Sequence, residues 1–131
     1  DKIAARVKNL GKQAKINVNY SALVLKIMDQ LYDGIETRMI DELMAQQCAT
    51  MNQQNPALGV LAGYISISNH QKNTTFTAEL ISVVRELGSD LLSSEFIDFV
   101  ELHHNVLEGM IDYERDFLID YFGFKTLEKS Y

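Results

Sequence analysis

The chain has 131 residues, 47% of them hydrophobic, and its 18 acidic and 12 basic residues give a formal net charge of -6. This length suits a single domain that buries roughly two-thirds of the surface of its unfolded chain. The acidic balance disfavours nucleic acid and anionic membranes as partners, because both attract continuous basic surfaces.

The single cysteine excludes an internal disulfide and a cysteine-based zinc site. The apolar runs are too short to span a membrane, and the start lacks the layout of a signal peptide, so we expect a soluble, cytoplasmic protein. The chain begins at Asp1 and its last residues carry no stop signal. We therefore expect that both ends are cut from a longer protein.

Apolar residues recur with helical spacing along nearly the whole chain, which predicts an all-α fold with short connections. The first predicted helix covers residues 2–10 and stops at Gly11, and a polar connection leads to a second helix over residues 20–32, closed by Asp33 and Gly34. The apolar positions of these helices are Ile3, Val7, Leu10, Leu23, Val24, Ile27, Met28 and Leu31.

A third helix is predicted to start at a capping Thr37 and to fade into the polar residues 52–55, and a fourth begins with Pro56 in its first turn. Their expected core positions are Ile40, Leu43, Met44, Cys48, Met51, Leu58, Leu61, Ala62 and Ile65. The methionines at positions 28, 39, 44 and 51 are spaced as core filling.

After a weak boundary in the polar residues 69–75, a fifth helix is predicted to end at Gly88. A sixth is capped by Ser93 or Ser94 and stops near Gly109. The apolar positions of the two are Phe76, Leu80, Val83, Val84, Leu87, Phe96, Phe99, Val100, His103 and Leu107. Residues 111–131 are denser in aromatic side chains than a helical stripe requires.

Three features of the sequence are candidate functional sites. Glu101 and His104 have the Glu-x-x-His spacing of two-metal carboxylate bundles, but the motif occurs once and a solvated pair on a helix surface is favoured. Cys48 lies on an apolar stripe, where a structural role is favoured over a reactive thiol. Asp41 follows Thr37 by one turn, and the spacing favours a helix cap over a contact to a ligand hydroxyl.

The run YFGFKTLEKSY at residues 121–131, preceded by YERDF at residues 113–117, resembles a signature stretch of the class I ribonucleotide reductase large subunit. Two earlier stretches are similar to the same family in order and spacing. Leu31-Tyr32 with Gly34, Thr37, Asp41 and Leu43 resembles the entry to the third helix of its amino-terminal ATP cone, and Leu61-Ala62 through Ile67-Ser68-Asn69 with Lys72 resembles the fourth cone helix. Asp1-Lys2-Ile3 matches the start of the first cone helix.

The resemblance covers the whole chain and implies that residues 1–74 are a partial ATP cone of four helices. Residues 75–131 would be the helical amino-terminal region that precedes the reductase barrel. The phosphate-binding hairpin of the cone would lie before Asp1, and the barrel with its cysteines after Tyr131. The sequence departs from the family where Glu114 replaces an aspartate and where His70-Gln71 replaces a Leu-His pair.

For the parent protein, the resemblance implies reduction of ribonucleoside diphosphates by radical chemistry, with a small subunit and further copies of the large subunit as partners. It implies ATP and dATP as allosteric effectors, and it puts Lys2, Thr37 and Asp41 at positions that border the nucleotide. A lysine can meet a phosphate, and an aspartate can accept from a sugar hydroxyl or an amino group. We expect no catalytic residue, metal or cofactor within the fragment itself.

Two other readings stay open on the sequence. The chain is alternatively a free-standing helical regulatory or assembly module derived from that region, which an immediate start and stop codon in the coding sequence would support. A metal-carboxylate bundle would require bound iron or manganese in the purified protein.

Overall fold

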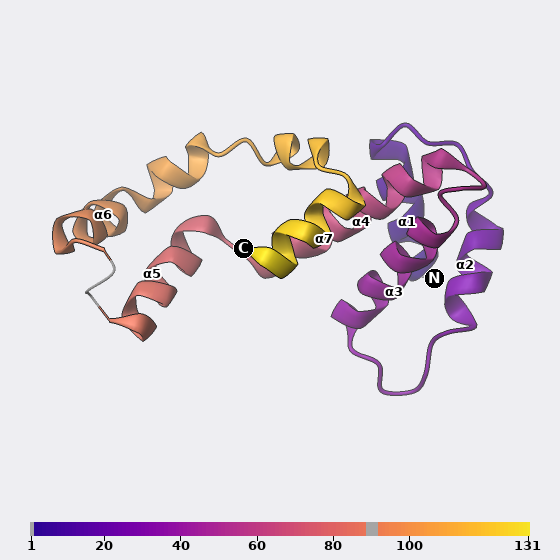
Figure 1. Ribbon diagram of the computed structural model, residues 1–131, viewed down its shortest axis with the longest axis horizontal. Coiled ribbons are helices and arrows are strands. Elements are labelled where there is room, and N and C mark those ends of the chain that lie inside the picture. The colour runs from indigo at the N-terminus through magenta and orange to yellow at the C-terminus, as the bar shows by residue number, and fades with distance from the viewer. Residues whose placement is uncertain (1, 89–91) are drawn as a thin grey trace. The chain divides into compact units, whose positions relative to one another are not determined.

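The computed structural model describes residues 2–88 and 92–131 (Figure 1). Every regular element within these residues is a helix, which confirms the predicted all-α class. In chain order the elements are α1 (Lys2–Gln13), α2 (Tyr20–Met28), α3 (Thr37–Thr50), α4 (Pro56–Asn73), α5 (Phe76–Leu87), α6 (Ser94–Met110), the 3-10 helix η1 (Tyr113–Leu118) and α7 (Tyr121–Ser130). Asp1, which the sequence places at the start of the first helix, lies outside the described residues.

The chain forms two compact units. The larger unit comprises the residues up to His70 together with Asp116–Tyr131, and the smaller unit comprises Gln71–Arg115. The polar residues 69–75 do not end the fourth helix, because α4 continues to Asn73. Residues 116–131 therefore pack with the first part of the chain in space, while the division of the sequence into a cone and a following region stays a prediction.

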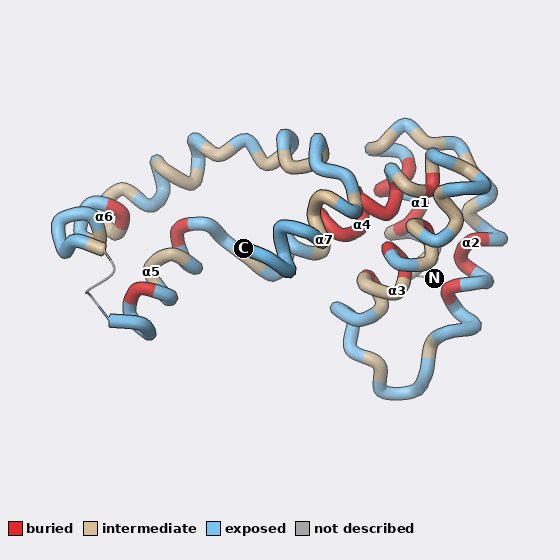
Figure 2. The backbone as a smooth tube through the Cα atoms, viewed as in Figure 1, coloured by how far each residue is buried: buried red, intermediate tan, exposed pale blue. Residues whose placement is uncertain are grey.

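The core of the larger unit is built from one apolar face of each of its first four helices (Figure 2). The inner face predicted for the fourth helix is confirmed, since its four residues are each at most 5% exposed. Burial of such side chains contributes roughly 1.5–3 kcal/mol each, which fixes these helices against one another. The buried members of this core are Val7, Leu10, Leu23, Ile27, Met44, Ala45, Cys48, Leu58, Leu61, Ala62 and Ile65.

Helix α7 lies against α4 within the larger unit (Figure 1). A methyl group at Gly63 would be 3.3 Å from the backbone nitrogen of Tyr121, so a residue without a side chain lets the two backbones approach. The rings of Tyr64 and Phe117 stack with their centroids 4.5 Å apart, and Tyr121 packs against the core. Part of the aromatic excess near the end of the chain is therefore used inside this unit.

An ion-pair network also joins α7 to α3. Lys125 Nζ lies 2.5 Å from Glu42 Oε1 and 2.9 Å from Glu128 Oε2. Partial burial of Lys125 lowers the pKa of its ammonium group, but the hydrogen bonds to Glu42 and Glu128 outweigh burial, so the pKa is raised overall. The side chain thus stays charged where α7 meets α3.

The prediction that Gly11 stops the first helix is wrong, because α1 continues to Gln13. Gly11 is buried inside the helix, where a Cβ atom would come within 2.6 Å of the Tyr20 ring. The tyrosine hydroxyl donates to the carbonyl oxygen of Ile16, which holds the ring in that place. The left-handed conformation predicted for Gly11 occurs instead at Lys15, with a φ of 56°.

The ends of the second and third helices also differ from the prediction. Helix α2 ends at Met28, one turn early, and Gly34 has a φ of 81° in the following loop. Thr37 is not the cap of α3, since Glu36 occupies the N-cap position and makes no side-chain cap bond. Met28 and Met39 are 45% and 39% exposed, so core filling holds only for the other two methionines of the set.

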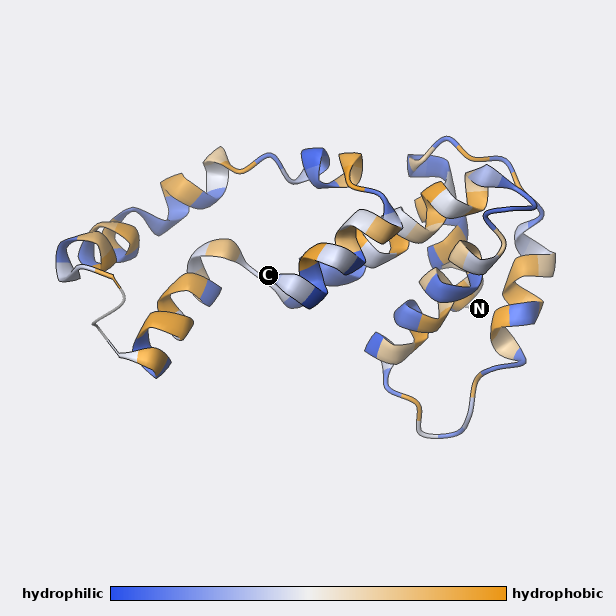
Figure 3. Ribbon diagram, viewed as in Figure 1, coloured by the Kyte–Doolittle hydropathy of each residue, from blue (hydrophilic) through white to orange (hydrophobic). Residues whose placement is uncertain are grey.

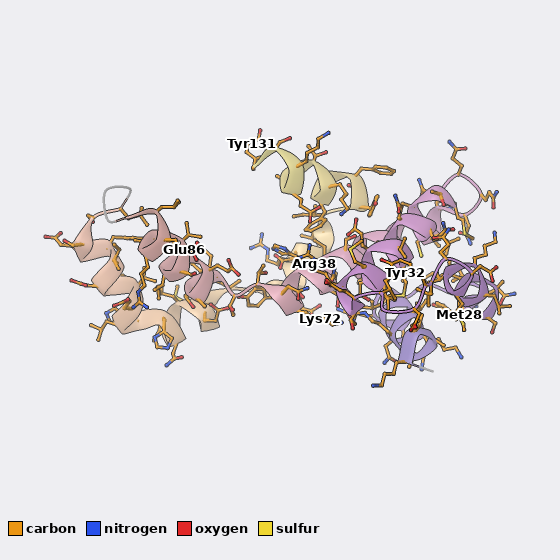
Figure 4. All side chains as sticks on the ribbon, turned by 90° about the horizontal axis from the view of Figure 1, so that it is seen from below. Met28, Tyr32, Arg38, Lys72, Glu86 and Tyr131 are labelled. Atoms are coloured by element: carbon orange, nitrogen blue, oxygen red, sulfur yellow. The ribbon has the colours of Figure 1, made fainter. Side chains whose placement is uncertain are left out.

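Met28 and Tyr32, both labelled in Figure 4, are exposed side chains of the larger unit, and Tyr32 is 63% exposed. Both follow the last buried turn of α2, where the chain leaves the core. The apolar stripe of the sequence is therefore wider than the face that the fold covers.

The smaller unit is built on the pair α5 and α6. Ser93 caps α6 by accepting from Phe96 N, and Gly88, with a φ of 89°, follows the end of α5, as predicted. Among the residues of this unit that the structure describes, only Thr77, Val84 and Val100 are buried. Figure 3 shows apolar residues along both helices, and several are exposed: Phe76, Val83, Leu87, Phe96, Phe99, Leu102, Val106 and Met110.

A carboxylate on α6 accepts hydrogen bonds from the start of α5 in the smaller unit. Glu108 on α6 accepts from the hydroxyl of Tyr113, from Thr77 Oγ1 at 3.0 Å and from Thr77 N at 3.3 Å. The Tyr113 bond is the largest influence on the pKa of Glu108 and lowers it; burial raises it, and the Thr77 bonds lower it further. The net effect is a lowered pKa, because these donors favour the ionised form.

Candidate functional site

A partly buried ion pair joins α1 to α3 in the larger unit. Arg6 Nε lies 2.6 Å from Asp41 Oδ1, and Arg6 Nη2 lies 2.7 Å from Asp41 Oδ2. Nη2 is also 3.4 Å from Ser68 Oγ on α4. The guanidinium group therefore meets the carboxylate through two parallel hydrogen bonds, the strongest geometry for such a pair.

The two partners differ in their exposure to solvent. The side chain of Asp41 is 3% exposed, whereas that of Arg6 is 22% exposed. Burial of a carboxylate is costly unless a cation and hydrogen bonds compensate it, and Arg6 supplies both. The helix-cap interpretation of Asp41 is thus corrected, because its side chain has a partner on another helix.

The structure places the other two predicted nucleotide contacts on the same helical rows as this pair. Lys2 precedes Arg6 by four residues on α1, and Thr37 precedes Asp41 by four on α3, so each pair shares one helix face. Lys2 and Thr37 are both exposed, and no hydrogen bond joins them. The Arg6–Asp41 pair is therefore the contact that brings the two rows together.

A surface depression runs along the α1 row. Its lining residues are Lys2, Ala5, Arg6, Asn9, Leu10 and Gln13. Apart from Ala5 and Leu10, these side chains carry hydrogen-bonding groups, and two of them are cationic. The depression can accept a ligand with oxygen acceptors or negative charge.

Sequence reasoning missed Arg6. Two signals were present, namely its spacing of four residues from Lys2 and the concentration of five of the twelve basic residues between positions 2 and 15. The net acidic charge of the whole chain concealed this local excess of positive charge. The sequence does not reveal Asp41 as the partner of Arg6, because the two residues lie 35 positions apart.

Cys48 lies in the core, with no exposed side-chain surface. Burial raises the pKa of its thiol to about 12. A thiol at this value is protonated at neutral pH and is a poor nucleophile, which confirms the structural role.

The Glu-x-x-His pair lies on the surface of α6. Glu101 Oε1 pairs with Arg85 Nη2 at 2.6 Å, and His104 Nδ1 is 3.0 Å from the Glu101 carbonyl oxygen. Across residues 2–88 and 92–131, the structure gathers no group of three or more His, Cys, Asp or Glu side chains able to hold a metal ion. Nothing in this geometry favours the metal-carboxylate reading.

A second, more apolar hollow lies between α4 and α7 in the larger unit. Its apolar lining residues include Ile67, Ile119, Phe124 and Leu127, and the ring of His70 meets Phe124 edge-on at 5.5 Å. Tyr131, also at this hollow, is 99% exposed at the tip of α7 (Figure 4). The hollow exposes more apolar surface than the α1 depression and suits an apolar contact.

Among the described helices none is both long enough and apolar enough to cross a membrane. No protein-family model matches the chain.

Three relatives are similar to the chain over its full length. It is 39% identical to a ribonucleoside-diphosphate reductase large subunit of Plasmodium falciparum (isolate Dd2), covering 17% of that protein. It is 36% identical to the proteins of the same name from Dictyostelium discoideum and Monkeypox virus, covering 16% and 18% of them. The chain thus spans about one-sixth of the length of these relatives and is a homologue of one segment of the ribonucleoside-diphosphate reductase large subunit.

Proposed function

We propose that the chain is the amino-terminal regulatory part of a ribonucleotide reductase large subunit, whose parent reduces ribonucleoside diphosphates to deoxyribonucleotides. The proposal is supported by relatives that carry the name of this enzyme subunit and align with the whole chain. The all-helical fold agrees with a cone and a helical region that precedes a barrel. The reductase small subunit and further copies of the large subunit are the proposed partners.

The chain by itself is proposed to be catalytically inactive. Reduction by radical chemistry needs a cysteine that forms a thiyl radical and a pair of cysteines that supplies electrons, whereas this sequence contains one cysteine. That cysteine, Cys48, is buried in the core and protonated at neutral pH. The chemistry of the parent is therefore assigned to the part of the protein outside this segment.

The regulatory role is proposed to depend on a nucleotide site that includes Lys2, Thr37 and Asp41, with ATP and dATP as effectors. The observation that carries it is the Arg6–Asp41 pair, which brings the row of Lys2 on α1 and the row of Thr37 on α3 to one contact. Lys2 supplies a cation for phosphate, while Thr37 supplies a hydroxyl group at the exposed end of α3.

The test is inhibition of the full-length enzyme by dATP, compared between wild type and Asp41→Asn. We expect the variant to keep its activity and to lose most of its inhibition, because the carboxylate that orders the two rows is neutralised. Glu36→Gln is the matched control, since it also removes one negative charge at the start of α3 but from an exposed side chain without a cap bond. Unchanged dATP inhibition in Asp41→Asn would overturn the proposed site.

A further inference from the structure

The unused donors of Arg6 point toward a ligand. Its Nε and Nη2 are engaged by Asp41, and Nη2 also approaches Ser68, whereas Nη1 makes no hydrogen bond to a described residue. A guanidinium group has five N–H donors and no acceptor, so Nη1 retains two donors for an acceptor atom outside the chain. The same side chain is 22% exposed and lines the depression along α1.

Asp41 is the less accessible member of the pair. With 3% of its side chain exposed, it offers a ligand almost no surface, while both of its oxygens accept from Arg6. Its effect on a ligand is therefore expected to pass through the group that it holds. A bidentate carboxylate fixes the plane of the guanidinium group and so fixes the direction of Nη1.

The charge around Arg6 favours an anionic ligand. Helix α1 and the two residues that follow it carry five of the twelve basic residues of the chain, at positions 2, 6, 8, 12 and 15. The depression itself holds the cations of Lys2 and Arg6 together with two side-chain amides, Asn9 and Gln13. Phosphate oxygens are acceptors with negative charge, and a planar guanidinium group matches them well.

We propose that Arg6 binds a phosphate group of the effector nucleotide in the α1 depression, and that Asp41 is the positioning residue that orients Arg6. This assignment rests on the proposed nucleotide site but changes the role of Asp41, which acts through Arg6 and does not itself accept from the sugar or the base. Lys2, one turn earlier on the same row, is placed to meet the same phosphate chain.

The test measures equilibrium binding of dATP to the full-length protein. The variants are Asp41→Asn, which leaves the cation without its orienting partner, and Arg6→Gln combined with Asp41→Asn, which removes the cation without leaving a buried charge unpaired. Lys8→Gln is the control, because Lys8 is an exposed cation of α1 outside the depression. The thermal transition of each variant shows that it is folded.

The proposal fixes the order of the affinities. Lys8→Gln should bind dATP within about twofold of wild type, Asp41→Asn several-fold more weakly, and the double variant about 10- to 100-fold more weakly than wild type, because hydrogen bonds to charged groups are the strong ones. If Asp41 met the effector directly, Asp41→Asn would already show the whole loss. Equal affinities of Asp41→Asn and the double variant would therefore overturn the role of Arg6.

Two competitors identify the group that Arg6 binds. Inorganic tripolyphosphate should compete with dATP at the wild-type protein and lose this ability in the double variant, whereas competition by deoxyadenosine should be the same in both proteins. An equal loss for deoxyadenosine would contradict a phosphate contact. If the wild-type protein binds dATP but the double variant binds it equally well, the Arg6 assignment fails alone; if the wild-type protein binds no dATP, the proposed nucleotide site fails with it.

Discussion

Removal of the Arg6 side chain should destabilise the larger unit far more than removal of a surface arginine. In Arg6→Ala the carboxylate of Asp41, which is 3% exposed, loses the two hydrogen bonds and the positive charge that Arg6 supplies. Loss of one partner from a buried pair typically costs about 3–5 kcal/mol. Since the Arg6 side chain is 22% exposed and solvent reaches the vacated space, we expect the free energy of unfolding to fall by about 3 kcal/mol, at the lower end of that range.

The assay is urea denaturation of the chain at neutral pH, followed by far-ultraviolet circular dichroism. In thermal denaturation, a loss of this size would correspond to a fall in Tm of roughly 10 °C for a chain of this length. The matched control is Arg85→Ala, which breaks the pair with Glu101 in the smaller unit, where the arginine side chain is 71% exposed. This exposed pair should contribute at most about 1 kcal/mol.

A second variant separates the loss of the pair from the burial of an unpaired charge. Arg6→Met combined with Asp41→Leu removes both charges, and replacement of a buried pair by apolar side chains is often neutral in stability. We expect the double variant to be more stable than Arg6→Ala. If Arg6→Ala lost no more than Arg85→Ala, the Arg6–Asp41 pair would not stabilise the larger unit, and the physical basis of the proposed site would be refuted.

Three other predictions follow from local geometry. Gly11→Ala should lower the free energy of unfolding by about 1–3 kcal/mol, because the new methyl group meets the Tyr20 ring. Gly109→Ala, with open space at its Cβ, should raise it by about 0.5–1 kcal/mol. Thermal denaturation of both variants checks the two expectations. Because the pKa of Glu108 is lowered in the folded state, its contribution to stability is fully present above the pKa of about 4.3 of an unfolded glutamate and is lost as pH falls through the lowered folded value. The urea midpoint should therefore fall less steeply with decreasing pH in Glu108→Gln than in wild type. An equal slope would contradict the assignment. The Cys48 thiol, whose pKa is about 12, should react with a thiol reagent at mildly alkaline pH only after denaturant is added, and rapid labelling of the folded chain would contradict its burial.

Local signals explain why most helices could be predicted. The inner face of α4, the Ser93 cap of α6 and the Gly88 end of α5 each depend on residues within a few positions of one another. One error lies where a more distant side chain contacts a helix. At Gly11 the helix continues and the Tyr20 ring lies against it, a contact that no pattern within the first helix contains.

The candidate site likewise contains residues that the sequence predicts and one that it does not. Lys2, Thr37 and Asp41 were singled out by their resemblance to a family pattern, and the spacing of four residues within each helix already placed their side chains on shared faces. Arg6 is not predicted as a site residue, because an arginine on an amphipathic helix usually faces solvent. Its importance depends on the burial of Asp41, which is a property of three packed helices.

The sequence by itself determined that the chain is helical, where most of its helices lie, and which enzyme subunit it resembles, because periodic apolar spacing and a motif shared with a family are local properties of a chain. The tertiary structure alone decided that the end of the chain packs against α4 and that Arg6 holds Asp41. An ion pair between residues 35 positions apart forms only when the burial of apolar faces brings α1 and α3 together. The partner of the Asp41 carboxylate is therefore a consequence of packing.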